Sequence, residues 1–79
     1  MEEDETIPLS QVRPGTPVVV ARLDGGEGFR SKVISMGLVP GKTVTVRSSS
    51  KRGPLVVQIE SGRVGLGRDV AERIFVKSD

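Results

Sequence analysis

The chain has 79 residues and contains no cysteine, histidine, tryptophan or tyrosine. A chain of this length fits one domain with a thin core, and without cysteine or histidine it has no disulfide, no thiolate nucleophile, no imidazole general base and no ordinary zinc or haem ligand. The composition therefore excludes most enzyme mechanisms.

Charge is distributed unevenly along the sequence. The formal net charge is +2, but four of the ten acidic residues stand at positions 2–5, so residues 6–79 carry 12 basic and 6 acidic side chains. Such a basic body suits a nucleic acid, an anionic membrane face or an acidic protein, or it is an ordinary solvated surface. No apolar segment typical of a secretory signal or a membrane helix follows the acidic N-terminus. We therefore expect a soluble, cytoplasmic protein.

The sequence predicts a short tail followed by one domain. Residues 1–6 are expected to form a disordered acidic tail, because they have almost nothing to bury, and residues 7–79 form the domain. Residues 7–12 predict one irregular turn. The first strand is predicted at residues 17–23, where the nearly continuous apolar character implies burial on both faces or a strong bend.

One helix is predicted at residues 27–36. Phe29, Val33 and Met36 recur at the spacing of one helix face, and Ile34 widens this apolar stripe. The helix is therefore predicted to be amphipathic, with its polar residues on the other faces.

The residues after the helix predict how it ends. Gly37 supplies the left-handed conformation that ends many helices, and Leu38 stands where a Schellman cap places its hydrophobic contact. Pro40 and Gly41 predict a type II turn, in which glycine takes the positive φ of the third position. We assign structural roles to Gly37, Pro40 and Gly41.

Short strands make up the rest of the domain. They are predicted at residues 42–47, 55–59, 63–67 and 74–76, with at most one helical turn at 68–73 before the last of them. Thirteen valines and four isoleucines against two alanines favour strands over helices. The predicted fold class is all-β: a small SH3-like barrel of about five short strands with one inserted α-helix.

Two segments of the sequence resemble the FeoA family. Residues 33–46 contain Met-Gly-Leu at 36–38 and Pro-Gly at 40–41 before a strand, which is similar to the helix–MGL–x–PG–strand signature of that family. Residues 62–76 resemble its closing segment, and residues 9–15 its start. The resemblance covers nearly the whole chain.

The resemblance implies a function. It implies a stand-alone, non-enzymatic cytoplasmic accessory protein of bacterial ferrous iron uptake, which acts with the FeoB membrane transporter, whose cytoplasmic portion holds a GTPase domain. The same fold occurs as the C-terminal domain of DtxR-type iron-dependent repressors. The alternative is a small nucleic-acid-binding SH3-like barrel, which the basic body supports and the shortage of aromatic residues opposes.

The candidate partner surface lies on the predicted helix. Arg30 and Lys32 fall outside its apolar stripe, and Met36 and Leu38 are expected to be partly exposed at its end. We predict that these four residues face the partner, with the basic side chains steering an acidic surface toward them.

A second basic group is predicted in the polar loop of the hairpin. Arg47, Lys51 and Arg52 gather around three serines there, either as solvated charges or as a second steering patch. The oligomeric state is left open between a monomer and a weak dimer that forms through leftover apolar surface.

No catalytic, cofactor-binding or metal-binding residue is predicted. Asp24 and Glu27 are interpreted as favourable charges at the start of the helix, in preference to a weak site for a hard cation. Residues 25–28 lack the spacings of phosphate-binding loops. Phe29 and Phe75 are the two aromatic residues, and both are assigned to the core. Neither a polyproline groove nor a base-stacking platform is therefore predicted.

Overall fold

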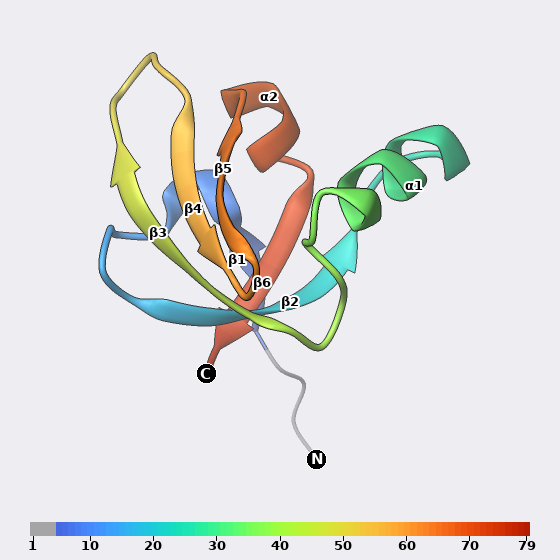
Figure 1. Ribbon diagram of the computed structural model, residues 1–79, viewed down its shortest axis with the longest axis horizontal. Helices are drawn as coiled ribbons and strands as arrows, with labels where there is room; N and C mark the ends of the chain where they lie inside the picture. The colour runs from blue at the N-terminus through green and yellow to red at the C-terminus, as the bar shows by residue number, and fades with distance from the viewer. Residues whose placement is uncertain (1–4) are drawn as a thin grey trace.

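Figure 1 shows the computed structural model, which describes residues 5–79. Its elements are β1 (Ile7–Pro8), the 3₁₀ turn η1 (Leu9–Gln11), β2 (Pro17–Leu23), α1 (Glu27–Ser35), β3 (Thr43–Ser49), β4 (Leu55–Ile59), β5 (Gly62–Leu66), α2 (Arg68–Ala71) and β6 (Ile74–Ser78). The strands predicted at 17–23 and 55–59 have those bounds. Most of the predicted acidic tail lies outside the described residues, and Glu5 and Thr6 belong to no regular element.

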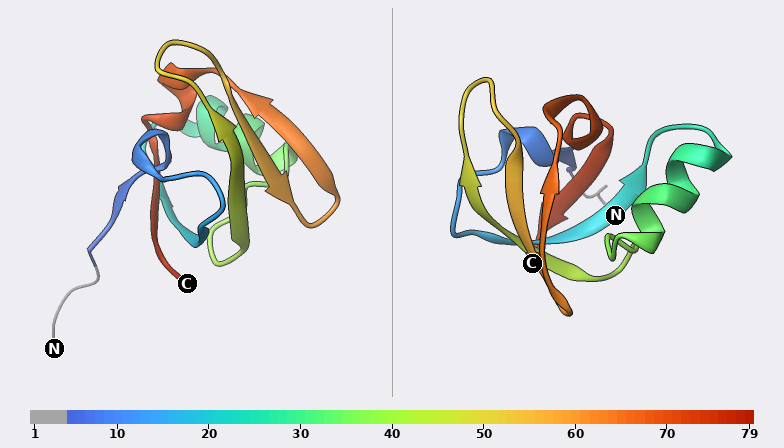
Figure 2. Two further views of the ribbon diagram at one scale, coloured as in Figure 1. Left: turned by 90° about the vertical axis from the view of Figure 1, so that its left-hand side faces the viewer. Right: turned by 45° about the horizontal axis from the view of Figure 1, so that its top comes forward.

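The six strands form one sheet in the order β1-β6-β2-β3-β4-β5, with every pair antiparallel. The sheet curls around the core as an open barrel (Figure 2). The all-β class with one inserted helix is confirmed. The prediction of about five strands missed β1, in which Ile7 pairs with Val76 of β6. The turn predicted at 7–12 is therefore a two-residue strand followed by η1, because pairing with distant β6 extends the chain at its start.

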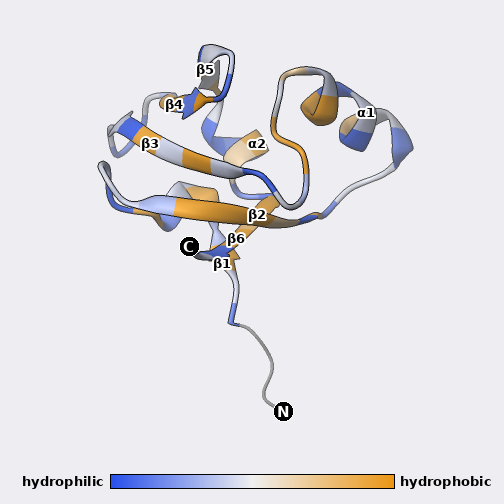
Figure 3. Ribbon diagram, turned by 60° about the horizontal axis from the view of Figure 1, so that its bottom comes forward, coloured by the Kyte–Doolittle hydropathy of each residue, from blue (hydrophilic) through white to orange (hydrophobic). Residues whose placement is uncertain are grey.

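A bend explains the long apolar run of β2. The register of β2 against β6 shifts between Val20 and Arg22, and such a bulge bends a strand and increases its twist. Val18, Val20 and Leu23 are buried, whereas Val19 is half-buried. Of the two explanations offered by the sequence, the bend is the observed one, and Figure 3 shows β2 as a curved hydrophobic strand.

The core fills the inside of the barrel. Its buried residues are Leu9, Val12, Val18, Val20, Leu23, Val33, Leu38, Val44, Val46, Leu55, Val57, Ile59, Leu66, Ala71, Ile74 and Val76. The assignment of both phenylalanines to the core is wrong. Phe29 is half-buried against the edge of the core. Phe75 is also half-buried, and the Arg22 guanidinium carbon lies 4.3 Å from its ring centroid.

The end of α1 has the geometry of a Schellman cap. Gly37 has φ +104°, its N–H donates to the Ile34 carbonyl at 2.9 Å, and the Leu38 N–H donates to the Val33 carbonyl at 3.2 Å. These two bonds satisfy carbonyls that the helix leaves without intrahelical donors. Val33 and Leu38 are both completely buried, so the hydrophobic partners of the cap are also core residues.

The next turn joins α1 to the sheet. The Lys42 N–H donates to the Val39 carbonyl at 3.0 Å, and Gly41 has φ +95°, as a type II turn requires of its third residue. The Gly41 N–H donates to the Val20 carbonyl at 2.8 Å, and the Val20 N–H to the Lys42 carbonyl at 2.9 Å. The chain therefore leaves the turn alongside β2 and continues as β3, which pairs with β2.

Arg68 at the start of α2 links three separate segments. One of its amino groups donates to the Ser10 carbonyl at 3.3 Å, and the other donates to Ser49 Oγ at 3.1 Å and to the Ser50 carbonyl. Its buried Nε has no hydrogen-bond partner among the described residues. The side chain therefore holds η1, α2 and the β3–β4 loop together.

Replacement of Arg68 by alanine is expected to lower the free energy of unfolding by about 1–2 kcal/mol, because several charge-assisted hydrogen bonds disappear together. Thermal unfolding measured by circular dichroism tests this value. Arg63→Ala is the matched control, since Arg63 is exposed and donates one hydrogen bond, to Gln58 Oε1. We expect that control to change stability by less than about 0.5 kcal/mol. Equal effects of the two substitutions on the free energy of unfolding would contradict the linking role of Arg68.

Candidate partner-binding surface

The basic residues of α1 are exposed. Arg30 and Lys32 lie on α1, which stands at one side of the barrel (Figure 1), and neither forms an ion pair among residues 5–79. Their helix ends in the cap described above, so its direction relative to the sheet is set by buried residues at one end. The structure therefore provides two accessible positive charges on one helix.

The apolar residues predicted beside them are placed differently. Leu38 is completely buried, so its expected partial exposure is wrong: the cap turns this side chain down into the core. Met36 is half-buried and packs against the edge of the core. Ile34, expected to widen the apolar stripe, is instead 39% exposed. Arg30, Lys32 and part of Met36 are thus accessible to a partner, and Leu38 is not.

A small groove runs between α1 and the segment formed by β5 and α2. We call it the α1–β5 groove, and its lining residues are Phe29, Lys32, Val33, Met36, Gly65, Leu66, Gly67 and Val70. It has a volume of about 150 Å³. The guanidinium of Arg73 lies 5.3 Å from the centroid of the Phe29 ring, within cation–π distance. Lys32 is the one charged residue in the lining, so the groove is mainly apolar with a positive charge at its rim.

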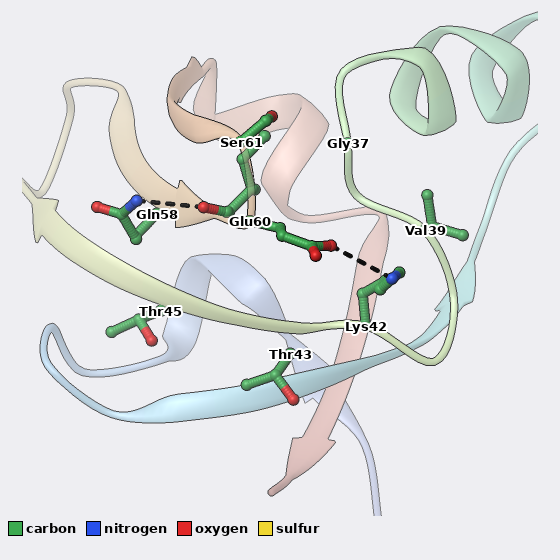
Figure 4. A pocket seen from close by; sticks show the side chains of 9 residues that line it. Gly37, Val39, Lys42, Thr43, Thr45, Gln58, Glu60 and Ser61 are labelled. Carbon is green, nitrogen blue, oxygen red and sulfur yellow. Dashed lines mark hydrogen bonds and ion pairs between the residues drawn. The ribbon is translucent and has the colours of Figure 1, made fainter.

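A larger, more open groove of about 550 Å³ lies over β3. Its lining residues are Gly37, Val39, Lys42, Thr43, Thr45, Gln58, Ile59, Glu60 and Ser61. Figure 4 shows the Lys42 and Glu60 side chains pointing toward each other, with Nζ and Oε1 3.3 Å apart. Both are exposed, and such surface pairs contribute little to stability. The lining mixes polar and apolar residues, and Lys42 and Glu60 give it charges of both signs.

The second basic group lies elsewhere on the molecule. Arg47, Lys51 and Arg52 are exposed on β3 and the loop that follows it, and that loop lies on the opposite side of the barrel from α1 (Figure 1). The two basic groups therefore do not form one continuous stripe of the kind that follows a nucleic acid backbone.

The acidic residues in the described part of the chain are scattered. Within residues 5–79, no three side chains of the histidine, cysteine, aspartate and glutamate types gather in one place. Asp24 and Glu27 are both exposed at the start of α1. Neither helix in this part of the chain has the length and apolar character needed to cross a membrane.

Sequence reasoning missed the α1–β5 groove. Its walls come from Phe29 and Met36 on one side and Val70 on the other, which lie far apart in the chain. The glycines at 65 and 67 indicate curvature or close backbone approach, and they are the one signal in the sequence that points to an open edge.

Comparison with known proteins gives consistent matches. The profile of the FeoA domain family matches residues 7–78. In Porphyromonas gingivalis, an Fe(2+) transport protein A/Fe(2+) transporter FeoB fusion protein is 36% identical over 70 residues, which are 87% of this chain and 8% of that relative. This chain therefore spans a small part of the fusion protein's length.

Two solved structures share the fold. A crystal structure described as iron uptake regulatory protein (FeoA) is 36% identical with a TM-score of 0.87, covering 92% of this chain and 97% of that one. A manganese-dependent transcriptional repressor is 25% identical with a TM-score of 0.88, covering 99% of this chain and 44% of the repressor chain. The SH3-like barrel predicted from the sequence is confirmed by these neighbours.

Proposed function

The chain belongs to the FeoA family, and from this membership we propose that it serves ferrous iron transport as a non-enzymatic accessory protein that binds the cytoplasmic part of a FeoB-type transporter. The fusion protein of Porphyromonas gingivalis carries this proposal. There, a region similar to this chain stands in one polypeptide with the transporter. Such a linkage keeps two partners at high effective concentration, which is useful when the two parts act on each other.

Ferrous iron is the cargo of the transporter in this proposal. Iron(II) sites in proteins usually use imidazole, thiolate or clustered carboxylates, and the sequence has neither histidine nor cysteine. The accessory protein therefore acts through protein contacts, and the transporter carries both the iron and the GTP hydrolysis.

The exposed charges of α1 provide the first contact. Arg30 and Lys32 are both exposed and stand on a helix whose end is fixed by the core. Exposed positive charges raise the rate of encounter with an acidic surface, and this effect decreases with salt. We therefore assign them a steering role toward an acidic patch of the transporter's cytoplasmic part.

Titration of the purified protein against the transporter's cytoplasmic part at physiological salt tests the proposal. Saturable binding is expected, and a parallel titration with nucleic acid at the same salt is expected to give none, because weak electrostatic binding is suppressed there. Nucleic acid binding without transporter binding would replace the proposal with the alternative of a nucleic-acid-binding barrel.

The double substitution Arg30→Glu and Lys32→Glu is expected to lower the association rate constant at low salt about tenfold, with an unchanged melting temperature. Surface plasmon resonance at several salt concentrations measures this. The matched control is Lys51→Glu with Arg52→Glu, which makes the same change in net charge on the opposite side of the barrel. A control that slows association equally would contradict steering by α1 and indicate a general charge effect.

A further inference from the structure

The two edges of the sheet differ in how open they are. β1 is one edge, and it is two residues long and contains Pro8, two features that make an edge a poor template for another strand. β5 (Gly62–Leu66) is the other edge. It is five residues long, contains no proline, and pairs with β4 without a register shift. Its outward-facing backbone N–H and C=O groups have no neighbouring strand in the sheet.

The α1–β5 groove lies next to this open edge. Phe29 of α1, Met36 directly after α1 and Val70 of α2 line it, and all three are half-buried rather than buried. Gly65 and Leu66 of β5 also line it. A strand added to the edge of β5 would direct alternate side chains toward this apolar lining.

Gly65 is a glycine that the fold itself does not need. Its φ is not positive, and a Cβ built on it meets no atom within 4 Å. Glycine in a strand costs roughly 0.5–1 kcal/mol relative to alanine, and in this position it often marks the close approach of another backbone. The missing side chain leaves space in the α1–β5 groove next to the edge of β5.

The charge of the groove lining indicates which side chains a bound segment needs. Lys32 is the charged residue of the lining, and the Arg73 guanidinium lies against the Phe29 ring. The acidic residues Asp69 and Glu72 are exposed near α2 but do not line the groove. A complementary segment therefore has apolar side chains at alternate positions and an acidic side chain that reaches Lys32.

We propose that β5 binds an extended segment of the transporter's cytoplasmic part, which adds to the sheet as a further strand and places its apolar side chains in the α1–β5 groove. This inference rests on the proposed function and specifies how the two proteins join. Backbone hydrogen bonds along β5 provide affinity, and the groove with Lys32 selects the segment, as in other cases of strand addition.

Gly65→Val tests this arrangement. Valine suits a strand and a Cβ has space here, so the melting temperature is expected to stay the same or rise. Its side chain would stand on the face of the strand and occupy the part of the groove that Gly65 lines, where the side chains of the bound segment are proposed to lie. We expect calorimetric titration against the transporter's cytoplasmic part to show at least about tenfold weaker binding. The control is Gly28→Ala on α1, where a Cβ also meets nothing within 4 Å outside the groove; its affinity is expected to be that of the wild type.

Hydrogen–deuterium exchange of the wild-type protein gives a second readout that requires no variant. The amides of β5 are expected to exchange more slowly in the complex, because strand addition gives them new acceptors. Failure of the wild-type protein to bind would overturn the proposed function and this inference together. Wild-type binding with unchanged exchange in β5, or with full affinity of the Gly65→Val variant, would overturn strand addition and leave the accessory role standing.

Discussion

Replacement of Gly37 by valine is expected to lower the free energy of unfolding by about 2–3 kcal/mol. The φ of +104° costs an L-residue about 1–2 kcal/mol. A Cβ at this position would lie 2.5 Å from the Cδ1 atom of Ile59. This atom is the free end of the side chain and must shift, so we expect the overpacking to add about 1 kcal/mol, the low end of its usual cost. A domain of this size has a stability of roughly 3–5 kcal/mol, so we expect the variant to lose a large part of it. Urea denaturation measures the loss.

Gly41→Val separates the two causes. Gly41 has a similar φ of +95°, but a Cβ on it meets nothing within 4 Å. We therefore expect this variant to lose about 1–2 kcal/mol from backbone strain alone, less than Gly37→Val. Equal losses would show that the Ile59 side chain moves aside without cost, and a negligible loss at both positions would contradict the requirement for glycine.

Local chemistry made the helix end and the following turn predictable. Glycine after a helix and Pro-Gly before a strand restrict φ at those residues whatever the rest of the chain does. The bounds of β2 and β4 were also predictable, because each is a run of β-branched residues between turn-forming residues. In these places the local sequence pattern and the tertiary structure favour the same backbone conformation.

Contacts between distant residues were not predictable in this way. β1 exists because Ile7 lies beside Val76, almost the full length of the chain away, and two residues have no strand pattern of their own. Leu38 follows the helix, where a leucine side chain lies either on the surface or in the core. The packing of the barrel against the helix end decides between the two, and the Leu38 side chain is buried. The α1–β5 groove likewise requires α1, β5 and α2 to be in place first.

The two proposed contributions to binding act on different rate constants. An exposed charge outside the groove, such as Arg30, alters mainly the association rate, whereas close contacts at the edge of β5 and in the groove, including those of Lys32, alter the dissociation rate as well. The single reversal Arg30→Glu is therefore expected to slow association with little change in complex lifetime. Gly65→Val is expected to shorten the lifetime with little change in association, so one kinetic experiment separates the two roles.

Replacement of Leu38 by alanine is expected to lower the free energy of unfolding by about 2–5 kcal/mol, because the side chain is completely buried and its removal leaves a cavity. Much of the variant would be unfolded at 37 °C, and its apparent affinity for a partner would decrease for that reason alone. Thermal unfolding followed by circular dichroism measures the loss of stability.

Met36→Ala is the matched comparison, since Met36 is half-buried and lines the α1–β5 groove. We expect it to cost roughly 1 kcal/mol in stability while weakening binding in a fully folded protein. Cooling to 15 °C, where more of the Leu38→Ala variant is folded, is expected to restore the binding of that variant and to leave the Met36→Ala defect in place. A stable Leu38→Ala protein that fails to bind would indicate that Leu38 contacts the partner directly, contrary to its buried position.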